Sequence, residues 1–248
     1  MTSKSVVETL QNRVSIRSFQ DKPIPDETLN LILETARRSP TSSNMQSYSL
    51  IVVKNPETKK RLAVLAKNQS YVESCPVFIA FCADLYRLEQ ACALHGVDIK
   101  RSLESTLVSS IDAALVGQST QTLAESLGLG VVMIGAMRNH PKEVADLLKL
   151  PEGVYVVYGM CLGWAEPESV PPQKPRLPQK LVVHEESYQT EGLTDAIQTY
   201  DRDLAQHYES LNRNLNEAAW SGPIAKRLQK VNRPELRKTL EALGFSFE

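Results

Sequence analysis

Two cationic side chains and a hydroxyl recur at a spacing of two residues near the start of the chain. In the stretch RVSIRSF, Arg13, Ser15 and Arg17 alternate with Val14 and Ile16. Residues two apart in extended backbone point to the same side, so the polar groups would lie together, opposite the apolar ones. That side could bind an anion. An exposed edge strand shows the same alternation without a ligand, so the motif alone leaves both interpretations open.

A second pair of cations with the same spacing belongs to a proline-rich stretch. Lys174 and Arg176 lie in KPRLP, where two prolines stiffen the backbone so that both cations can face one side. We predict that this strip and the strip at Arg13–Arg17 hold one phosphate. Each charge-assisted hydrogen bond to it would contribute about 1.5–3 kcal/mol. Alternatively, the strips are solvated or pair with Asp21 and Glu166, at about 0–1 kcal/mol for each exposed pair.

A run of hydroxyl side chains could also surround a ligand. Thr41, Ser42 and Ser43 follow a predicted helix and precede a predicted strand. A plain loop, a phosphorylation site and a polar rim around a ligand are all compatible with this run. The His and Asp partners of a serine nucleophile are not at recognisable positions.

The stretch GLGVVMIG resembles a dinucleotide fingerprint, but its context differs. A Rossmann glycine turn follows a strand and opens a helix, whereas Gly128 and Gly130 follow a helix and open a strand. We interpret these glycines, with Gly135, as a helix cap and as a place where the backbone approaches a flat ligand closely.

The composition limits the class of protein. The 248 residues are 42% hydrophobic and 23% charged, which is typical of a globular protein. Lys and Arg number 28 against 29 Asp and Glu, so no net positive field favours nucleic acid or anionic lipid, and we expect neither partner. No apolar run approaches the roughly 20 residues needed to span a bilayer.

Cysteine and histidine usage argues against a metal site. The four cysteines show no CxxC spacing, and the four histidines are scattered. The first residues lack the apolar run of a signal peptide. We therefore expect a cytoplasmic protein with reduced thiols and no bound metal.

Hydrophobic periodicity predicts interleaved helices and strands. Ser5 and Glu8 match a capping box that opens the first helix, which ends near Asn12. Five prolines within 166–179 exclude helix and central strand, so this segment should run extended across a ligand or a partner subunit, or form a flexible surface loop. Further helices are predicted over 26–38, 56–67, 85–96, 99–127, 141–150, 194–209, 217–231 and 234–243, and strands over 47–53, 76–84, 130–134 and 154–165.

Seven motifs follow one another along the chain: RVSIRSF, SPTSSNMQ, KNQSYV, AESLGLGVVMIGAMRN, GMCLGW, KPRLP and VHEESYQ. This ordered set resembles the nitroreductase family, and within it the oxygen-insensitive NAD(P)H nitroreductases and flavin reductases. The resemblance implies an α+β fold with a central mixed sheet flanked by helices, and one FMN-binding domain over residues 1–248. It further implies an intertwined homodimer with one FMN at each of two interface sites, in which a C-terminal extension over about 166–248 wraps the partner.

The resemblance also implies roles for individual residues. Arg13, Ser15 and Arg17 would hold the FMN phosphate or the N1/O2 edge of its ring, and Lys174 and Arg176 would approach the same cofactor. The other implied flavin contacts are Thr41, Ser42, Ser43 and Gln69, some of them from the partner subunit, and the backbone at Ile134, Gly135 and Ala136 near flavin N5; Arg138 and Arg213 match nucleotide contacts.

The function implied is an FMN-dependent oxidoreductase that transfers two electrons from NAD(P)H to nitroaromatics, quinones or free flavins. The chemistry would occur at FMN N5 with no catalytic side chain, and the absence of a separate nucleotide domain implies ping-pong kinetics. A flavin-binding redox sensor or carrier with slow turnover is the alternative. Leu211 and Asn216 stand where close relatives have arginines for the 2′-phosphate of NADPH, so the choice between NADH and NADPH is open.

Overall fold

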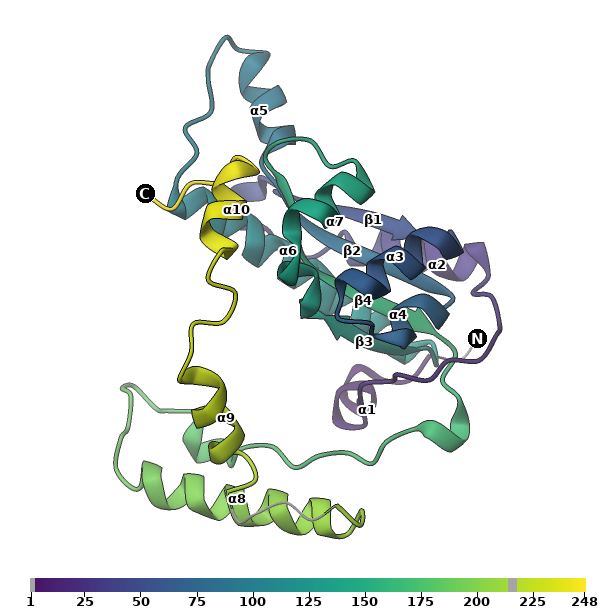
Figure 1. The fold of residues 1–248 in the computed structure, drawn as a ribbon, viewed down its shortest axis with the longest axis vertical. Helices are drawn as coiled ribbons and strands as arrows, with labels where there is room; N and C mark the ends of the chain where they lie inside the picture. Colours follow the sequence, from purple (N-terminus) through teal and green to yellow (C-terminus); the bar gives the residue numbers. More distant parts are fainter. Residues whose placement is uncertain (1–2, 214–217) are drawn as a thin grey trace. The chain divides into compact units, whose positions relative to one another are not determined.

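A computed structural model describes residues 3–213 and 218–248 (Figure 1). The chain divides into two compact units. The first contains the chain up to Pro171 together with Glu235–Glu248, and the second contains Pro172–Pro234. The start of the helix predicted over 217–231 lies outside the described residues. Asn216, which the nucleotide comparison named, also lies outside them.

The first unit is built on a four-stranded sheet with the order β1-β2-β4-β3. All neighbouring strands pair antiparallel, and the parallel part of the expected mixed sheet is a single bridge between Ser15 and Val131. The two central strands are buried on both faces, because their sequences are continuous apolar runs. The strands are β1 Tyr48–Val53, β2 Val77–Asp84, β3 Gly130–Ile134 and β4 Val154–Gly163.

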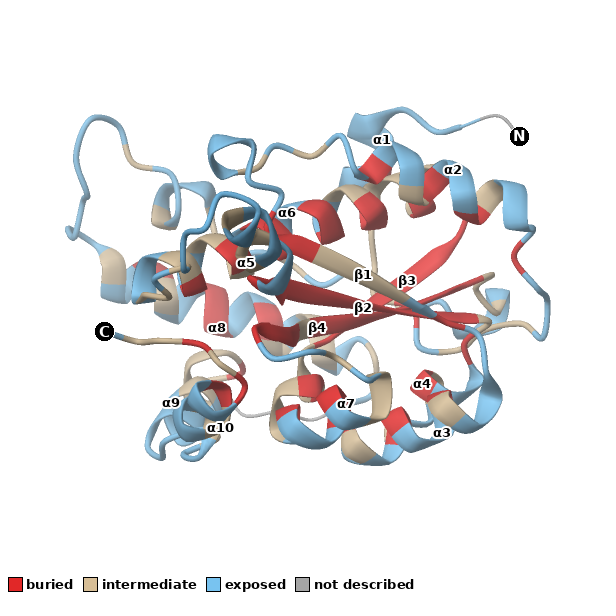
Figure 2. Ribbon diagram, turned by 90° about the horizontal axis from the view of Figure 1, so that it is seen from above, coloured by how far each residue is buried: buried red, intermediate tan, exposed pale blue. Residues whose placement is uncertain are grey.

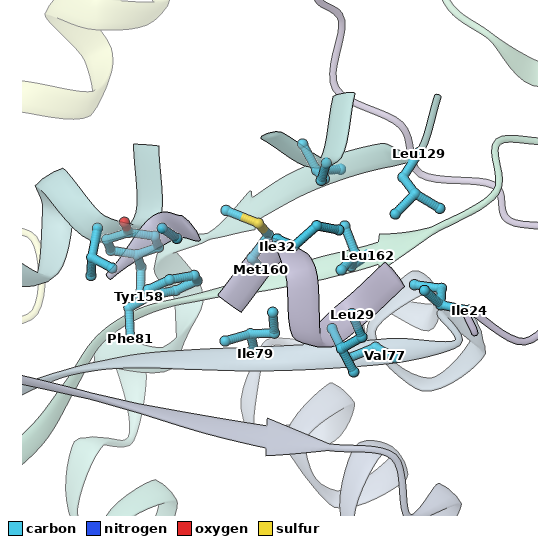
Figure 3. Packing of buried hydrophobic residues seen from close by; sticks show 14 of the residues in the cluster. Ile24, Leu29, Ile32, Val77, Ile79, Phe81, Leu129, Tyr158, Met160 and Leu162 are labelled. Carbon is cyan, nitrogen blue, oxygen red and sulfur yellow. The ribbon is translucent and has the colours of Figure 1, made fainter. Parts of the chain in front are cut away.

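Helices cover both faces of this sheet, which confirms the predicted α+β class. α1, α2 and α6 lie on one face, and α3, α4 and α7 on the other (Figure 2). Alternate residues of β2 divide between the two cores: Phe81 packs with α2 and α6 (Figure 3), and Phe78 packs toward α3 and α4. The helices of this unit are α1 Val6–Gln11, α2 Asp26–Ala36, α3 Pro56–Leu65, α4 Ser70–Ser74, α5 Tyr86–Ala93, α6 Leu103–Ser126, α7 Pro141–Leu148 and α10 Leu236–Ala242.

The long helix α6 begins later than predicted. The prediction started it at residue 99, but Ser102 is its N-cap: its hydroxyl accepts from the Ser105 N–H at 3.2 Å, and its own N–H donates to the Ser105 hydroxyl at 2.9 Å. Residues 99–102 therefore lie outside the helix. At the other end Gly128 has φ +85°, which confirms its predicted role as a helix cap.

The two faces of α6 are reversed relative to an ordinary amphipathic helix. Its buried face carries small and polar residues such as Ser109, Asp112 and Ala113. An apolar stripe with four-residue spacing points away from the core, with exposed fractions between 38% and 55%: Leu103, Leu107, Ile111 and Leu115.

The second unit is small and helical. α8 Leu193–Glu209 and α9 Ser221–Leu228 pack through a cluster of Tyr200, Leu204 and Trp220. α8 begins one residue before the predicted start and ends at the predicted residue 209, whereas α9 ends three residues before the predicted end at residue 231. The proline-rich segment was predicted to hold no helix, but it opens with a 3-10 turn at Pro167–Ser169, since proline fits the first position of a helical turn.

Candidate functional site

The segment Arg13–Phe19 is extended, as predicted, and is attached to the edge of the sheet. Ser15 bridges Val131 of β3, and the Ile16 N–H donates to the Val131 carbonyl at 2.9 Å. Ile16 is only 6% exposed. A Cβ on Gly130 would lie 2.7 Å from Ile16 Cγ1. The close backbone approach at Gly130 is therefore to Ile16, which corrects its interpretation as a place for a flat ligand.

The side chains of Arg13 and Ser15 share one side of this segment, as the alternation predicted. The Arg13 guanidinium donates to the Ser15 hydroxyl at 3.3 Å, and the exposed Arg17 donates to the Ser15 carbonyl at 3.4 Å. Sequence reasoning missed one partner: Arg13 Nε lies 3.5 Å from a carboxylate oxygen of Glu125, near the end of α6. Burial raises the pKa of Glu125, and Arg13 opposes that rise. The charge of Arg13 is thus partly balanced, whereas that of Arg17 faces solvent.

The hydroxyl run lies in an unusual loop. Ser42–Asn44 form a short 3-10 turn, and Ser43, Asn44 and Gln46 all have positive φ between 47° and 57°. Ser42 and Ser43 are exposed.

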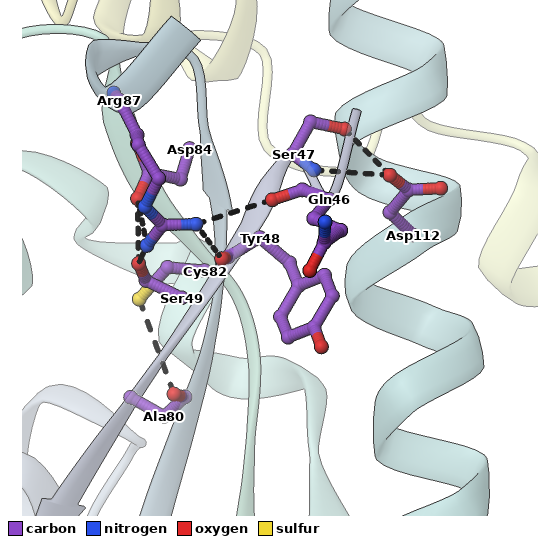
Figure 4. Close-up of polar contacts among 9 residues, drawn as sticks. All are labelled: Gln46, Ser47, Tyr48, Ser49, Ala80, Cys82, Asp84, Arg87 and Asp112. Carbon is purple, nitrogen blue, oxygen red and sulfur yellow. Dashed lines mark hydrogen bonds and ion pairs between the residues drawn. The ribbon is translucent and has the colours of Figure 1, made fainter. Parts of the chain in front are cut away.

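The buried Asp112 of α6 holds this loop. It accepts from the Ser42 N–H at 3.1 Å. It also accepts from the N–H and hydroxyl of Ser47, at 3.1 and 2.7 Å (Figure 4). Sequence reasoning missed Asp112, because nothing in its local sequence marks its contact with a loop 65 to 70 residues earlier.

The loop and the N-terminal strip meet α6 at different points. Ser42 contacts it at Asp112, and Arg13 contacts it at Glu125. Thirteen residues of helix span about 20 Å at 1.5 Å per residue. The structure therefore does not bring the hydroxyl run and the N-terminal strip together within one chain.

Gln69 is the residue before α4, and its side-chain oxygen accepts from the Tyr71 hydroxyl at 2.8 Å. Val72 of α4 packs in the core cluster that contains Ile134 and Ala136. Gly135 and Ala136 begin the 3-10 turn Gly135–Asn139. That Gln69 and the end of β3 contact one flavin stays a prediction.

The two predicted nucleotide contacts lie in separate units. Arg138 folds back on the sheet and donates to the Val157 carbonyl of β4, with its guanidinium beside Gly135. Arg213 is exposed in the second unit, where its N–H donates to the Tyr208 carbonyl at 2.9 Å. Their nucleotide role stays a prediction.

The strip of Lys174 and Arg176 is exposed in the second unit. Lys174 Nζ lies over the Tyr208 ring at 5.3 Å from its centroid, and Arg176 donates to the Lys174 carbonyl at 3.4 Å. Between them the Pro175 carbonyl accepts from the Tyr200 hydroxyl at 3.0 Å. Tyr200 is therefore an anchor that sequence reasoning did not find. The clamp between this strip and Arg13–Arg17 stays a prediction.

Metal ligands and membrane spans are the remaining features of the described residues that bear on function. Within 3–213 and 218–248, no group of three or more His, Cys, Asp or Glu side chains could hold a metal ion. No helix in these same ranges is long and apolar enough to cross a membrane.

The chain matches known proteins over nearly its whole length. Residues 10–164 match the nitroreductase family, and residues 174–248 match the C-terminal domain of that family. The chain belongs to the nitroreductase family, as the resemblance of its motifs predicted.

Individual relatives match over nearly their full length. The FMN reductase (NADPH) of Bacillus subtilis is 37% identical over 247 residues, covering 98% of each chain. The oxygen-insensitive NADPH nitroreductase of Salmonella typhimurium is 38% identical, covering 97% of this chain and 98% of its own. Among solved structures, NfrA2 of B. megaterium has a TM-score of 0.93 at 38% identity, with 98% of each chain covered. The NADPH:FMN oxidoreductase of Vibrio harveyi complexed with NAD+ has a TM-score of 0.87 at 36% identity, covering 97% and 98%.

Proposed function

We propose that this protein is an FMN-dependent oxidoreductase that transfers two electrons from NAD(P)H to nitroaromatics, quinones or free flavins. The single observation that carries the proposal is the N-terminal strip: Arg13 and Ser15 share one side of a segment fixed to β3, and the exposed Arg17 follows them, in a chain of the nitroreductase family. Relatives of similar length are named FMN reductase and NADPH nitroreductase, which supports the same activity here.

The donor set fits a flavin mononucleotide. The guanidinium groups of Arg17 and Arg176 are exposed, and Ser15 supplies a hydroxyl beside Arg13, so cations and hydroxyl suit a phosphate. When bound, FMN supplies hydride acceptance and donation at N5. The chain itself binds and orients: Gln69 presents an amide held by Tyr71, and the turn at Gly135 and Ala136 supplies backbone. Positive charge at Arg13 would favour an electron-rich ring.

A homodimer is part of the proposal. The stripe from Leu103 to Leu115 on α6 leaves apolar side chains exposed, and Val6 and Val7 of α1 are 63% and 64% exposed. A second copy of the chain would bury these exposed apolar side chains. The points at which the hydroxyl loop and the N-terminal strip contact α6 are about 20 Å apart along the helix. A flavin that contacts both would therefore contact the loop of one copy and the strip of the other, which supports the dimer independently. The wrapping of residues 166–248 around that copy belongs to the same proposal.

Anaerobic rapid mixing tests the activity. Purified protein loaded with FMN should lose its absorbance near 450 nm within the turnover time when NADH or NADPH is added, and recover it when a quinone or nitroaromatic follows. Parallel double-reciprocal plots would support the ping-pong scheme. Bound flavin that neither nucleotide bleaches would reject the enzyme and favour the slow redox carrier, and protein that takes up no FMN would reject both. Comparing NADH with NADPH decides the nucleotide preference.

A further inference from the structure

A buried carboxylate on α6 is connected to the loop that carries the hydroxyl run. Asp112 is 1% exposed and accepts three hydrogen bonds, from the Ser42 N–H and from the N–H and hydroxyl of Ser47. Its two oxygens divide this work: Oδ1 faces Ser42, and Oδ2 faces Ser47. The carboxylate therefore ties two points of the chain that are five residues apart to one position on the helix.

The backbone between these two points is strained. Ser43, Asn44 and Gln46 have φ of 47°, 57° and 51°, in the left-handed region that residues other than glycine rarely adopt. Such conformations persist only where surrounding contacts fix them, and they cluster at ligand sites. Ser42 and Ser47 flank the strained residues, so the bonds to Asp112 hold both ends of the unfavourable stretch.

A second anchor fixes the far end of the loop. The Arg87 guanidinium donates to the carbonyls of Gln46 and Tyr48 at 3.1 and 3.0 Å, and Asp84 holds it at 3.0 Å (Figure 4). Arg87 acts on the end that enters β1. Asp112 also reaches Ser42, inside the hydroxyl run, and so governs the part of the loop that faces solvent.

We infer that Asp112 is a positioning residue for flavin binding: it holds Thr41, Ser42 and Ser43 in the conformation that lines the cofactor. The inference rests on the proposed FMN function. Asp112 is buried under the loop and takes no part in the chemistry. It acts through the loop, because it keeps the hydroxyl run preorganised.

The test compares wild-type protein with Asp112→Asn, both stripped of flavin and titrated with FMN by fluorescence quenching. Asparagine keeps the shape of the side chain but turns one acceptor oxygen into a donor, which opposes an N–H of Ser42 or Ser47. We expect the Kd for FMN to rise roughly 10- to 100-fold, with kcat at saturating FMN within about twofold of wild type. Amide hydrogen exchange at Ser42 and Ser47 should accelerate in the flavin-free variant.

Arg101→Gln is the matched control for lost stability. Arg101 is a half-buried side chain of the same unit that donates to Glu89, Glu152 and the Gly244 carbonyl, away from the loop. The Arg101→Gln variant should have a lower melting temperature than wild type and an unchanged Kd for FMN. Ser47→Ala removes one of the three donors to Asp112 and should weaken FMN binding roughly threefold to tenfold.

Each outcome of these experiments supports or overturns the inference about Asp112. Weakened FMN binding in Asp112→Asn with unchanged binding in Arg101→Gln supports the inference. Wild-type affinity in a folded Asp112→Asn overturns it, as does an equal loss in Arg101→Gln at equal loss of stability. If Asp112→Asn does not fold, Ser47→Ala decides by the same criterion. Wild-type protein that binds no FMN rejects the proposed function instead, and accelerated exchange at Ser42 still reports whether Asp112 holds the loop.

Discussion

The two cationic strips have the same sequence pattern but are held in different ways. Arg13–Arg17 is fastened to the sheet by the Ser15 bridge and by the burial of Ile16. The segment with Lys174 and Arg176 has no strand partner among the described residues. It is held by its prolines and by side-chain contacts, among them the hydrogen bond from Tyr200 to the Pro175 carbonyl and the packing of Leu177. The same spacing of charges is thus positioned once by the sheet and once by side-chain contacts and local stiffness, so equal substitutions should act unequally.

The electrostatic surroundings differ as well. Arg13 lies beside the poorly exposed carboxylate of Glu125, which offsets part of its charge. Lys174 and Arg176 are exposed, and the neighbour of Lys174 is an aromatic ring. The charge of the first strip is therefore partly neutralised by a neighbouring carboxylate, whereas the neighbour of Lys174 leaves its charge in place.

Removing one exposed arginine from each strip should have the largest effect. Arg17→Ala with Arg176→Ala loses two charge-assisted hydrogen bonds, so FMN affinity should fall roughly 100-fold or more. Absorbance of the purified protein near 450 nm measures the retained flavin, and circular dichroism should show an unchanged fold because both side chains are exposed. Lys60→Ala with Lys180→Ala, two other exposed cations, should keep the flavin. A double variant that retains stoichiometric FMN would contradict the clamp.

A substitution beneath the N-terminal strip tests whether the core positions it. In Gly130→Ala the new methyl would lie 2.7 to 2.9 Å from the Ile16 side chain, so Ile16 or its backbone must move. The free energy of unfolding should fall by about 1–3 kcal/mol, and FMN affinity should fall by roughly tenfold.

A second change should relieve this clash. In an Ile16→Ala background the added methyl finds room, so the two substitutions should be clearly non-additive in chemical denaturation. Additive losses would show that Gly130 acts independently of the strip.

The elements of this fold were largely predictable because their signals are local. β3 was predicted at its observed bounds, and the cap at Ser5 is present, with its hydroxyl accepting from the Glu8 N–H. The shared side of Arg13 and Ser15 followed from the two-residue period of extended backbone. Such features depend on neighbours within a few residues, which the sequence displays directly.

The partners of the site residues were not predictable, because they are distant in sequence. Glu125 and Asp112 lie on one helix, and their contacts depend on how α6 packs against segments far away in the chain. Asp112 lies in no motif, and the motif that contains Glu125 does not indicate Arg13 as its partner. The apolar stripe of α6 was also misleading on its own, since Leu107 and Ile111 are exposed while Ser109 is buried. Periodicity reveals a helix but not which neighbour, in the same chain or another, receives its apolar face.

Loss of the hydrogen bond that Tyr200 donates to the second strip should have a moderate effect. Tyr200→Phe removes the hydroxyl that donates to the Pro175 carbonyl, which should lower the stability of this unit by about 0.5–1.5 kcal/mol. The strip should become less ordered, and FMN affinity should fall roughly threefold to fivefold. Tyr188→Phe, at a tyrosine of the same unit that is 70% exposed, is the matched control and should change neither quantity. An unchanged affinity in Tyr200→Phe would mean that the prolines alone position the strip.

The smallest effect should come from the carboxylate that balances Arg13. Burial raises the pKa of Glu125 above its ordinary value despite the opposing effect of Arg13, so the folded state holds this proton more tightly than the unfolded state does. The stabilising contribution of the protonated group is complete below the unfolded pKa, near 4.3, and is lost as the pH rises through the raised value. Glu125→Gln cannot ionise. Its melting temperature relative to wild type should therefore increase as the pH rises from about 4 to 7.

FMN binding by Glu125→Gln measures whether Glu125 acts on the N-terminal strip through its charge or by positioning Arg13. With Glu125→Gln the guanidinium of Arg13 is no longer opposed by a carboxylate, so FMN should bind roughly twofold to threefold more tightly in titrations at pH 7 and low salt. The gain should shrink in 0.5 M NaCl, because screening weakens the attraction between Arg13 and a phosphate. If FMN instead binds more weakly at both salt concentrations, Glu125 holds the Arg13 side chain in place. In that case Glu125 would position Arg13, as Tyr200 helps to position the second strip, and charge balance would be the smaller of its two effects.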